Sequence, residues 1–152
     1  MKKNKLKQNR YFVLIIVFLV NQIIFGQSVF GKWKTVDDKT GATKAIVEVY
    51  EEAGLLNAKI IKILEKGRED AVCIKCKGEL KDKPIKGMHI IQNFKKNGAD
   101  EYKGSNLLDP ESGTIYRGKL WLDSDDPNKL KVRGYVAFLY RTQTWHRVKG
   151  DE

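Results

Sequence analysis

Residues 129–136 read Lys-Leu-Lys-Val-Arg-Gly-Tyr-Val, and this stretch decides the fold class. Leu130, Val132, Gly134 and Val136 fall on one face of an extended chain, while charged and polar residues fall on the other. Residues 114–122 repeat the pattern, with Tyr, Gly and two Leu alternating with Arg, Lys and Trp. Alternation with a period of two predicts half-buried strands and an antiparallel sheet.

Clusters of Gly, Pro, Asp and Asn divide the chain at short intervals, as turns do. One of them, Asp-Pro-Glu-Ser-Gly at residues 109–113, has the composition of a type I turn, which we favour over a cation site or an acid–base pair. Eight strands are expected between the turns, at residues 31–36, 43–51, 55–64, 87–94, 101–108, 114–123, 129–138 and 139–148. The Phe138–Leu139 boundary fits either a tight turn or a bend in one longer strand. Residues 59–66 also allow a short helix, but their β-branched content favours a strand.

The first 26 residues have the layout of a secretory signal peptide. Five basic residues and no acid come first, an apolar run of residues 11–20 follows, and Gly26, Gln27 and Ser28 form a small polar end. A retained anchor is the alternative, but a spanning helix needs about 20 apolar residues and this run is shorter. We therefore divide the chain into a signal peptide at 1–26 and one β domain at 27–152. The product is expected in the periplasm or outside the cell.

Removing the leader changes the charge of the protein. The chain has 29 Lys and Arg against 19 Asp and Glu, a net charge of +10. Without the five basic residues of the leader, 24 basic residues face 19 acids, a net of +5. The remaining cations are interspersed, whereas a nucleic-acid site gathers them in one patch. We therefore expect no nucleic-acid partner, and we expect no membrane span in the mature chain.

Cys73 and Cys76 form a C-x-x-C pair within residues 67–86, a stretch without strand character that we interpret as a long loop. Such loops are often functional. A disulfide is the default for neighbouring cysteines in an exported protein. A redox-active pair is the second interpretation, since Lys75 and Lys77 supply nearby cations. A zinc site is the third, although His89 and His146 each stand alone in a strand.

Trp33 opens the first expected strand, and Arg141 and Arg147 lie in the last. In a closed barrel these strands pair, which would bring Trp33 near one of the two arginines for a cation–π contact. The pattern resembles the lipocalin and wider calycin group. In that group an early Gly-x-Trp meets a late Arg across the closed end of an eight-stranded barrel.

A second resemblance covers nearly the whole mature chain and implies a single antiparallel, approximately eight-stranded, lipocalin-like barrel. Six short motifs follow in the order seen in a family of small exported bacterial proteins, domain of unknown function 2147. They are Gly31-Lys32-Trp33, Cys73-Ile74-Lys75-Cys76, Lys83-Pro84-Ile85-Lys86-Gly87, Leu108-Asp109-Pro110-Glu111-Ser112-Gly113, Lys131-Val132-Arg133-Gly134-Tyr135 and Arg141-Thr142-Gln143-Thr144-Trp145. The resemblance implies no established activity. Many relatives carry Gly where this chain has Asn57-Ala58.

No nucleophile elbow, phosphate loop, zinc-protease motif or dinucleotide fingerprint occurs in the chain. We therefore expect no enzymatic activity, no cofactor and no bound metal, and we expect a monomer. An eight-stranded barrel is either filled by side chains or holds one small ligand. The residues expected to face such a ligand are Tyr116, Trp121, Arg133, Gln143 and Trp145.

Three classes of function remain open from the sequence. The first is a binding module for a small apolar or amphipathic ligand, and it is the one we favour. The second is an envelope structural or interaction protein that uses the loop at residues 67–86. The third is a thiol–disulfide redox protein that uses Cys73 and Cys76.

Overall fold

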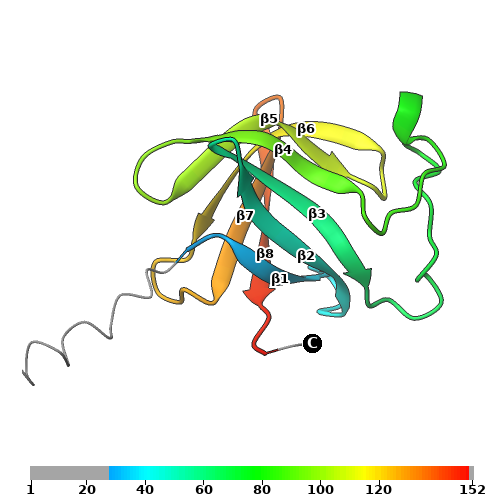
Figure 1. The fold of residues 1–152 in the computed structure, drawn as a ribbon, viewed down its shortest axis with the longest axis horizontal. Coiled ribbons are helices and arrows are strands. Elements are labelled where there is room, and N and C mark those ends of the chain that lie inside the picture. Colours follow the sequence, from blue (N-terminus) through cyan, green and yellow to red (C-terminus); the bar gives the residue numbers. More distant parts are fainter. Residues whose placement is uncertain (1–27, 151–152) are drawn as a thin grey trace, which may run out of the picture.

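Eight strands close into one barrel in chain order, each antiparallel to its neighbours (Figure 1). The computed structural model describes residues 28–150, so the predicted signal peptide lies outside the described residues. The strands are β1 (Gly31–Val36), β2 (Thr43–Glu52), β3 (Leu55–Ile63), β4 (His89–Lys96), β5 (Glu101–Asp109), β6 (Thr114–Leu122), β7 (Lys129–Val136) and β8 (Leu139–Arg147). One short 3-10 turn, η1 (Gly78–Leu80), lies between β3 and β4. The predicted all-β antiparallel barrel is confirmed.

The strand boundaries agree with the sequence pattern to within two residues. The uncertain boundary near Phe138 is a tight turn, because Val136 pairs with Leu139 and leaves only Ala137 and Phe138 between them. Residues 59–63 belong to β3, so the helical alternative is wrong.

Since the chain runs up and down, the connections fall at two ends of the barrel. The turns β1–β2, β3–β4, β5–β6 and β7–β8 share one end, which we call the loop end. It includes the cysteine loop, defined as the β3–β4 connection at residues 64–88. The other end carries the short turns β2–β3, β4–β5 and β6–β7, and we call it the closed end. Figure 1 shows the cysteine loop beside the β5–β6 turn on the right and the β4–β5 turn on the left.

The β3–β4 pair contains an irregularity that a buried amide stabilises. Asn93 has a φ of 57°, and the register of β4 against β3 shifts beside it. The Asn57 side chain is 6% exposed and its Oδ1 accepts a hydrogen bond from the Asn93 backbone N–H at 3.0 Å. The family resemblance expects Gly at this position. In this chain the Asn57 side chain instead accepts a hydrogen bond from the Asn93 N–H, a donor that the bulge takes out of the β3–β4 hydrogen-bond ladder.

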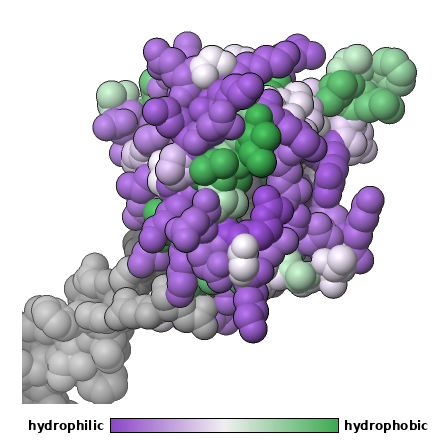
Figure 2. Space-filling model, turned by 90° about the vertical axis from the view of Figure 1, so that its right-hand side faces the viewer, coloured by the Kyte–Doolittle hydropathy of each residue, from purple (hydrophilic) through white to green (hydrophobic). Residues whose placement is uncertain are grey.

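Hydrophobic side chains from every strand meet inside the barrel. The large side chains with less than 2% exposure include Trp33, Val47, Val49, Leu56, Ile91, Phe94, Leu120 and Leu130. Figure 2 views the molecule from the side that carries the cysteine loop and shows a mostly hydrophilic surface with a hydrophobic area near its middle. Within residues 28–150, no helix is long and apolar enough to cross a bilayer.

Candidate functional site

The closed end is held by Trp33 and Arg147, which are direct register partners on β1 and β8. The Arg147 guanidinium lies 4.1 Å from the centroid of the fully buried Trp33 ring. It also donates to the backbone carbonyls of Ser28 at 2.6 Å and Phe30 at 3.2 Å. Burial lowers the pKa of Arg147. A cation stacked on an indole and bound to carbonyls fixes the chain N-terminal to β1 against β8, so this site closes the barrel structurally.

Arg141 does not approach Trp33, and its expected part in closing the barrel is wrong. It stands at the start of β8, at the loop end, where it pairs with Gly134 of β7. Its Nε and Nη2 donate to Asp38 Oδ2 in the β1–β2 turn at 2.9 and 2.6 Å. Arg147 lies six positions further along the extended strand, about 20 Å at the usual rise, so the two arginines hold opposite ends of β8.

The interior of the barrel is filled by large side chains that lie against a row of glycines. Gly104, Gly118 and Gly134 are direct neighbours across β5, β6 and β7, and we call them the glycine row. A Cβ at Gly104 would stand 2.3 Å from Phe94 Cδ1, and one at Gly118 would stand 2.8 Å from Leu107 Cδ2. Because Gly104 and Gly118 have no side chain, Phe94 and Leu107 can pack directly against the backbone at these positions.

The five residues expected to face a ligand divide between two faces of the sheet. Tyr116, Gln143 and Trp145 lie on the inner face, where Trp145 is 3% exposed and directly opposite Leu130. Trp121 and Arg133 lie on the outer face, because their neighbours Leu120 and Val132 point inward. The Arg133 guanidinium lies 5.2 Å from the Trp121 ring centroid, on the surface of the barrel. These two residues do not face the interior as expected.

The cysteine loop is folded back on itself around the Cys73–Cys76 disulfide. Its two arms meet at an isolated bridge between Val72 and Pro84, and the Cys73 N–H donates to Lys83 O at 2.9 Å. Cys73 is fully buried and Cys76 is 3% exposed. Cys73 Sγ lies 3.2 Å from Pro110 O of the β5–β6 turn, a packing contact because a disulfide sulfur carries no proton. The disulfide therefore packs against the β5–β6 hairpin.

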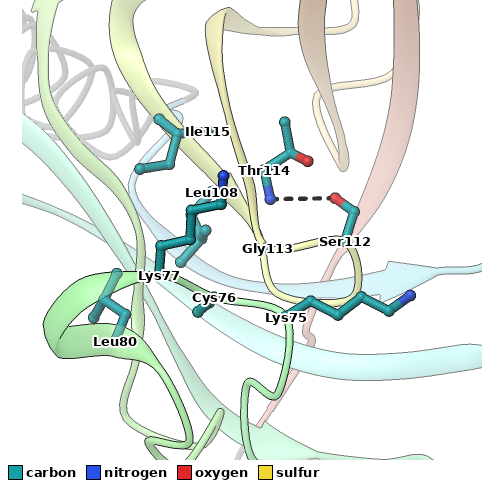
Figure 3. A pocket seen from close by; sticks show the side chains of 9 residues that line it. All are labelled: Lys75, Cys76, Lys77, Leu80, Leu108, Ser112, Gly113, Thr114 and Ile115. Carbon is teal, nitrogen blue, oxygen red and sulfur yellow. Dashed lines mark hydrogen bonds between the residues drawn. The ribbon is translucent and has the colours of Figure 1, made fainter.

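Between this loop and the hairpin lies a hollow of about 400 Å³, which we call the loop hollow. Its apolar lining comes from Leu80, Leu108 and Ile115. In Figure 3 the Lys77 side chain extends from the cysteine loop toward the hairpin, and Lys75 runs past the turn at the opposite side. Ser112, Gly113 and Thr114 complete the wall, with the Ser112 hydroxyl accepting from the Thr114 N–H at 3.3 Å.

A second hollow, of about 840 Å³, lies on the outer face of β4 to β7. Polar and basic side chains line it, including Gln92, Lys95, Lys103, Arg117 and Lys119. Lys119 also binds Glu101 at 2.6 Å, and this contact lowers the pKa of Glu101. Both hollows described here lie outside the barrel interior.

The six motifs quoted from the sequence all lie within the part of the chain that matches a known family. The family described as "Uncharacterized protein conserved in bacteria (DUF2147)" matches residues 31–147, which span all eight strands. The chain belongs to the DUF2147 family. No curated protein matches it.

Among solved structures, this DUF2147 chain is similar to one described as "Protein HP1028 from the human pathogen Helicobacter pylori belongs to the lipocalin family". The two share 20% sequence identity and a TM-score of 0.68, over 81% of this chain and 84% of that chain. At this identity the likeness concerns the fold, and it confirms a lipocalin-like barrel.

Charged side chains tie the DUF2147 barrel together across its loop end. Lys44, the second residue of β2, binds Glu111 of the β5–β6 turn at 2.5 Å and Asp37 of the β1–β2 turn at 3.3 Å. The bond to Glu111 raises the pKa of Lys44. Backbone N–H groups of Thr40 and Lys39, with Lys44, lower the pKa of Asp37 to about 2. The network holds the wall of the loop hollow against the opposite side of the barrel.

No grouping suited to a metal ion, of three or more His, Cys, Asp or Glu, occurs within residues 28–150 of this DUF2147 chain. Of the two histidines considered as zinc ligands, His89 hydrogen-bonds Tyr50 through Nε2 at 2.9 Å on the outer face, and His146 is exposed. The described residues therefore offer the C-x-x-C pair no further ligands.

Sequence reasoning missed the loop hollow and the glycine row. The hollow joins residues about 35 positions apart, Leu80 and Ile115, and depends on how the cysteine loop folds back. The glycine row had a visible signal, since Gly104, Gly118 and Gly134 each interrupt an otherwise regular strand. Glycine inside a strand often marks a close approach by another group, here Phe94 and Leu107.

Proposed function

We propose that this protein is a non-enzymatic binding module that holds a small amphipathic molecule in the loop hollow, outside the barrel interior. The observation that carries the proposal is the hollow itself: about 400 Å³ between the cysteine loop and the β5–β6 hairpin, where the disulfide of the loop packs against the hairpin. Small-molecule sites usually have volumes of about 300–1,000 Å³ and are lined by apolar side chains with a few polar groups.

The filled interior supports the choice of the loop hollow over the lumen. Trp33, Leu56, Phe94, Leu120 and Leu130 are fully buried, and the glycine row is covered by side chains of the chain itself. A ligand in the lumen would have to displace packed side chains, which costs free energy at every lost contact. The loop hollow requires no such displacement.

The lining indicates an alkyl or aryl group that carries one negative charge. Leu80, Leu108 and Ile115 offer apolar surface, and Lys75 and Lys77 are exposed cations at its edge. Within residues 28–150, none of those that line the hollow carries a carboxylate. A carboxylate or phosphate on a short chain satisfies both features, because the cations attract its charge while the apolar walls cover its tail.

The test is a titration with three probes of equal chain length, followed by native mass spectrometry and calorimetry. Dodecanoate is expected to bind one to one, dodecanol more weakly, and dodecylamine least of all. Lys77→Gln is expected to weaken dodecanoate without affecting dodecanol, and Ile115→Gln to weaken both.

Two matched controls accompany these variants. Lys81→Gln removes an exposed lysine from the same loop, and Ile74→Gln removes an apolar side chain that is 71% exposed; neither residue lines the hollow. Both controls are expected to bind as the unmodified protein does. Absence of binding by all three probes, or equal losses in controls and test variants, would disprove the proposal.

A second candidate function is an envelope interaction protein, and the exposure of Ile74 favours it. Ile74 and Val72 are 71% and 37% exposed on a loop that the disulfide holds in place. An apolar side chain fixed in an exposed position suits contact with another protein. A photo-crosslinking residue at position 74, introduced into cells that make the protein, is expected to capture one partner; capture of none contradicts this candidate.

Export is part of the proposal and has its own test. The three-part layout of residues 1–26 and the disulfide between Cys73 and Cys76 support a site of action outside the cytoplasm. N-terminal sequencing of protein recovered from cell fractions is expected to begin near Gln27 in a non-cytoplasmic fraction. Full-length protein confined to the cytoplasm would refute export.

A further inference from the structure

The turn between β7 and β8 exposes an unbroken run of uncharged residues. We call Val136–Tyr140 the apolar tip: Val136, Phe138, Leu139 and Tyr140 are 56%, 91%, 62% and 62% exposed. In Figure 2 a hydrophobic group projects from the upper right of the molecule, where this turn lies. Hairpin turns normally carry Asn, Asp or Gly, yet Ala137 adopts a φ of 51° here. The turn thus lacks the polar residues that would make it an ordinary solvent-facing loop.

Three arginines stand immediately behind the apolar tip. Arg133 lies 4.1 Å from the centroid of the Tyr140 ring, and Arg117 is directly opposite Tyr135 on the neighbouring strand. Arg141 follows Tyr140 and binds Asp38, a carboxylate of the adjacent turn. Among the ion pairs within residues 28–150, none joins Arg117 or Arg133 to a carboxylate. Arg117 and Arg133 therefore place positive charge at the base of the tip, whereas Arg141 lies among the carboxylates of Asp38, Asp109 and Asp37.

We propose that the apolar tip docks the protein onto an anionic lipid bilayer. Phe138 and Leu139 enter the boundary of the acyl chains, Tyr140 lies at headgroup depth, and Arg117 and Arg133 meet lipid phosphates. Apolar side chains beside cations are the composition of segments that bind the surface of anionic membranes. The proposal does not depend on the loop hollow.

The size and shape of the tip favour a bilayer over a protein partner. A stable protein interface buries about 800 Å² on each side, with some 20–30 residues. The apolar tip has five residues on a narrow projecting turn. Such a projection matches a fluid surface, which closes around inserted side chains, and charge complementarity with acidic headgroups adds to the attraction.

The test is flotation with vesicles made of equal parts phosphatidylglycerol and phosphatidylcholine, compared with phosphatidylcholine alone. The chain beginning at Gln27 is used, because the apolar run at residues 11–20 would bind lipid by itself and all eight strands lie within residues 31–147. The protein is expected to float with the anionic vesicles, less so as salt rises, and weakly with neutral ones.

Variants separate insertion from general attraction of a basic protein. The double variant Phe138→Ser/Leu139→Ser is expected to bind anionic vesicles at least about tenfold more weakly, since each buried side chain contributes about that factor. Arg117→Gln is expected to weaken binding at low salt. Ile74→Ser is the matched control, because Ile74 is 71% exposed on the cysteine loop and does not line the loop hollow, and its binding is expected to stay unchanged.

A tryptophan at position 138 reports depth. In Phe138→Trp, the emission maximum of the added tryptophan is expected to shift to shorter wavelength with anionic vesicles only. Its quenching by acrylamide is expected to decrease under the same condition. The proposal is overturned if the protein binds no vesicle at low salt, or if the Phe138→Ser/Leu139→Ser variant binds as well as the unmodified chain. Vesicle-independent self-association that this double variant abolishes would also overturn it, in favour of contact between copies.

Discussion

Lys44 and Glu111 form an ion pair that spans the loop end of the barrel. Their strands are on opposite sides, since Lys44 lies on β2 and Glu111 joins β5 to β6, three strands or more away. The same lysine binds Asp37, so one ammonium holds two turns in place. The β5–β6 turn that carries Glu111 also contacts the cysteine loop through Pro110. This pair therefore adds a contact between the β5–β6 turn, beside the loop hollow, and the opposite side of the barrel.

The first prediction concerns the energy of that pair. In a double-mutant cycle of Lys44→Met and Glu111→Gln, we expect a coupling of about 0.5–1 kcal/mol in the free energy of unfolding, because both side chains are partly solvated. Urea denaturation measures it. The exposed pair Lys59 and Glu48, within one sheet face, is the control and should couple no more strongly. A coupling of zero for Lys44 and Glu111 would mean that they do not fix the turn.

The second prediction is a pH dependence that originates in Asp37. Its pKa is lowered from 3.8 to about 2, so the folded state gains stability from this carboxylate above about pH 4. That contribution disappears as the pH falls from about 4 to about 2, where the folded state binds the proton less readily than the unfolded one. Asp37→Asn should therefore flatten the decline in stability over this range, measured as the urea midpoint at several pH values.

Asp70→Asn provides the comparison for Asp37. Asp70 is exposed, and within residues 28–150 its carboxylate makes no ion pair or side-chain hydrogen bond. Because this substitution removes no contact of the folded state, we expect its urea midpoint to match that of the unmodified protein. If the urea midpoint of Asp37→Asn falls as steeply as that of the unmodified chain between about pH 4 and about pH 2, the backbone N–H groups of Thr40 and Lys39 do not stabilise the Asp37 carboxylate as the structure indicates.

The sequence specified the strands well because each is decided locally. In residues 129–136 the alternation of Leu130 and Val132 with Lys131 and Arg133 fixes both the strand and its inner face. The same logic failed for Trp121, since an aromatic side chain suits either face: here Lys119 and Arg133 cover it on the outside, at 4.7 and 5.2 Å from its ring centroid. Pattern alone does not distinguish an indole in a core from one beneath two cations.

The site required contacts that local pattern does not contain. Asp-Pro-Glu-Ser-Gly at 109–113 predicted a turn, but its contact with Cys73 follows from the folding-back of a loop that has no periodicity. Two arginines in β8 were equivalent candidates for Trp33, and the choice of Arg147 depends on the register between β1 and β8. The register between β1 and β8, the two strands that close the barrel, depends on the tilt and stagger of all eight strands. The sequence of either strand alone therefore could not predict it.

The third prediction tests the filled interior through the glycine row. Gly104→Ala would place a methyl group 2.3 Å from Phe94 Cδ1, so we expect a loss of about 1–3 kcal/mol in the free energy of unfolding. Gly134→Ala is the matched control, because its nearest neighbour is at 3.5 Å, an ordinary contact. Adding Phe94→Leu to Gly104→Ala should recover part of the loss. Equal stability of the two alanine variants would show that Phe94 does not lie on Gly104.

The fourth prediction concerns the closed end. Arg147→Lys keeps the charge but loses the planar group that stacks on Trp33 and binds Ser28 O and Phe30 O, and we expect it to cost about 2 kcal/mol. Arg141→Lys, at the loop end with a side chain 66% exposed, should cost less than about 0.5 kcal/mol. Urea denaturation followed by tryptophan fluorescence measures both. The assignment of Arg147 fails if the two variants are equally stable.

The last prediction decides between a structural and a redox-active disulfide. Thiol–disulfide exchange requires a thiolate to reach a sulfur, and Cys73 and Cys76 are 0% and 3% exposed. We therefore expect dithiothreitol to reduce the folded protein at least about tenfold more slowly than the urea-unfolded protein, measured by iodoacetamide trapping and mass spectrometry.

Exposing the disulfide should remove this protection. Pro110→Gly loosens the turn whose carbonyl lies 3.2 Å from Cys73 Sγ, and it is expected to speed reduction. Pro127→Gly, at the closed end, is the control and should leave the rate unchanged. Reduction of the folded chain at the rate of the unfolded one would instead place this pair among exchange-active disulfides and favour a redox function.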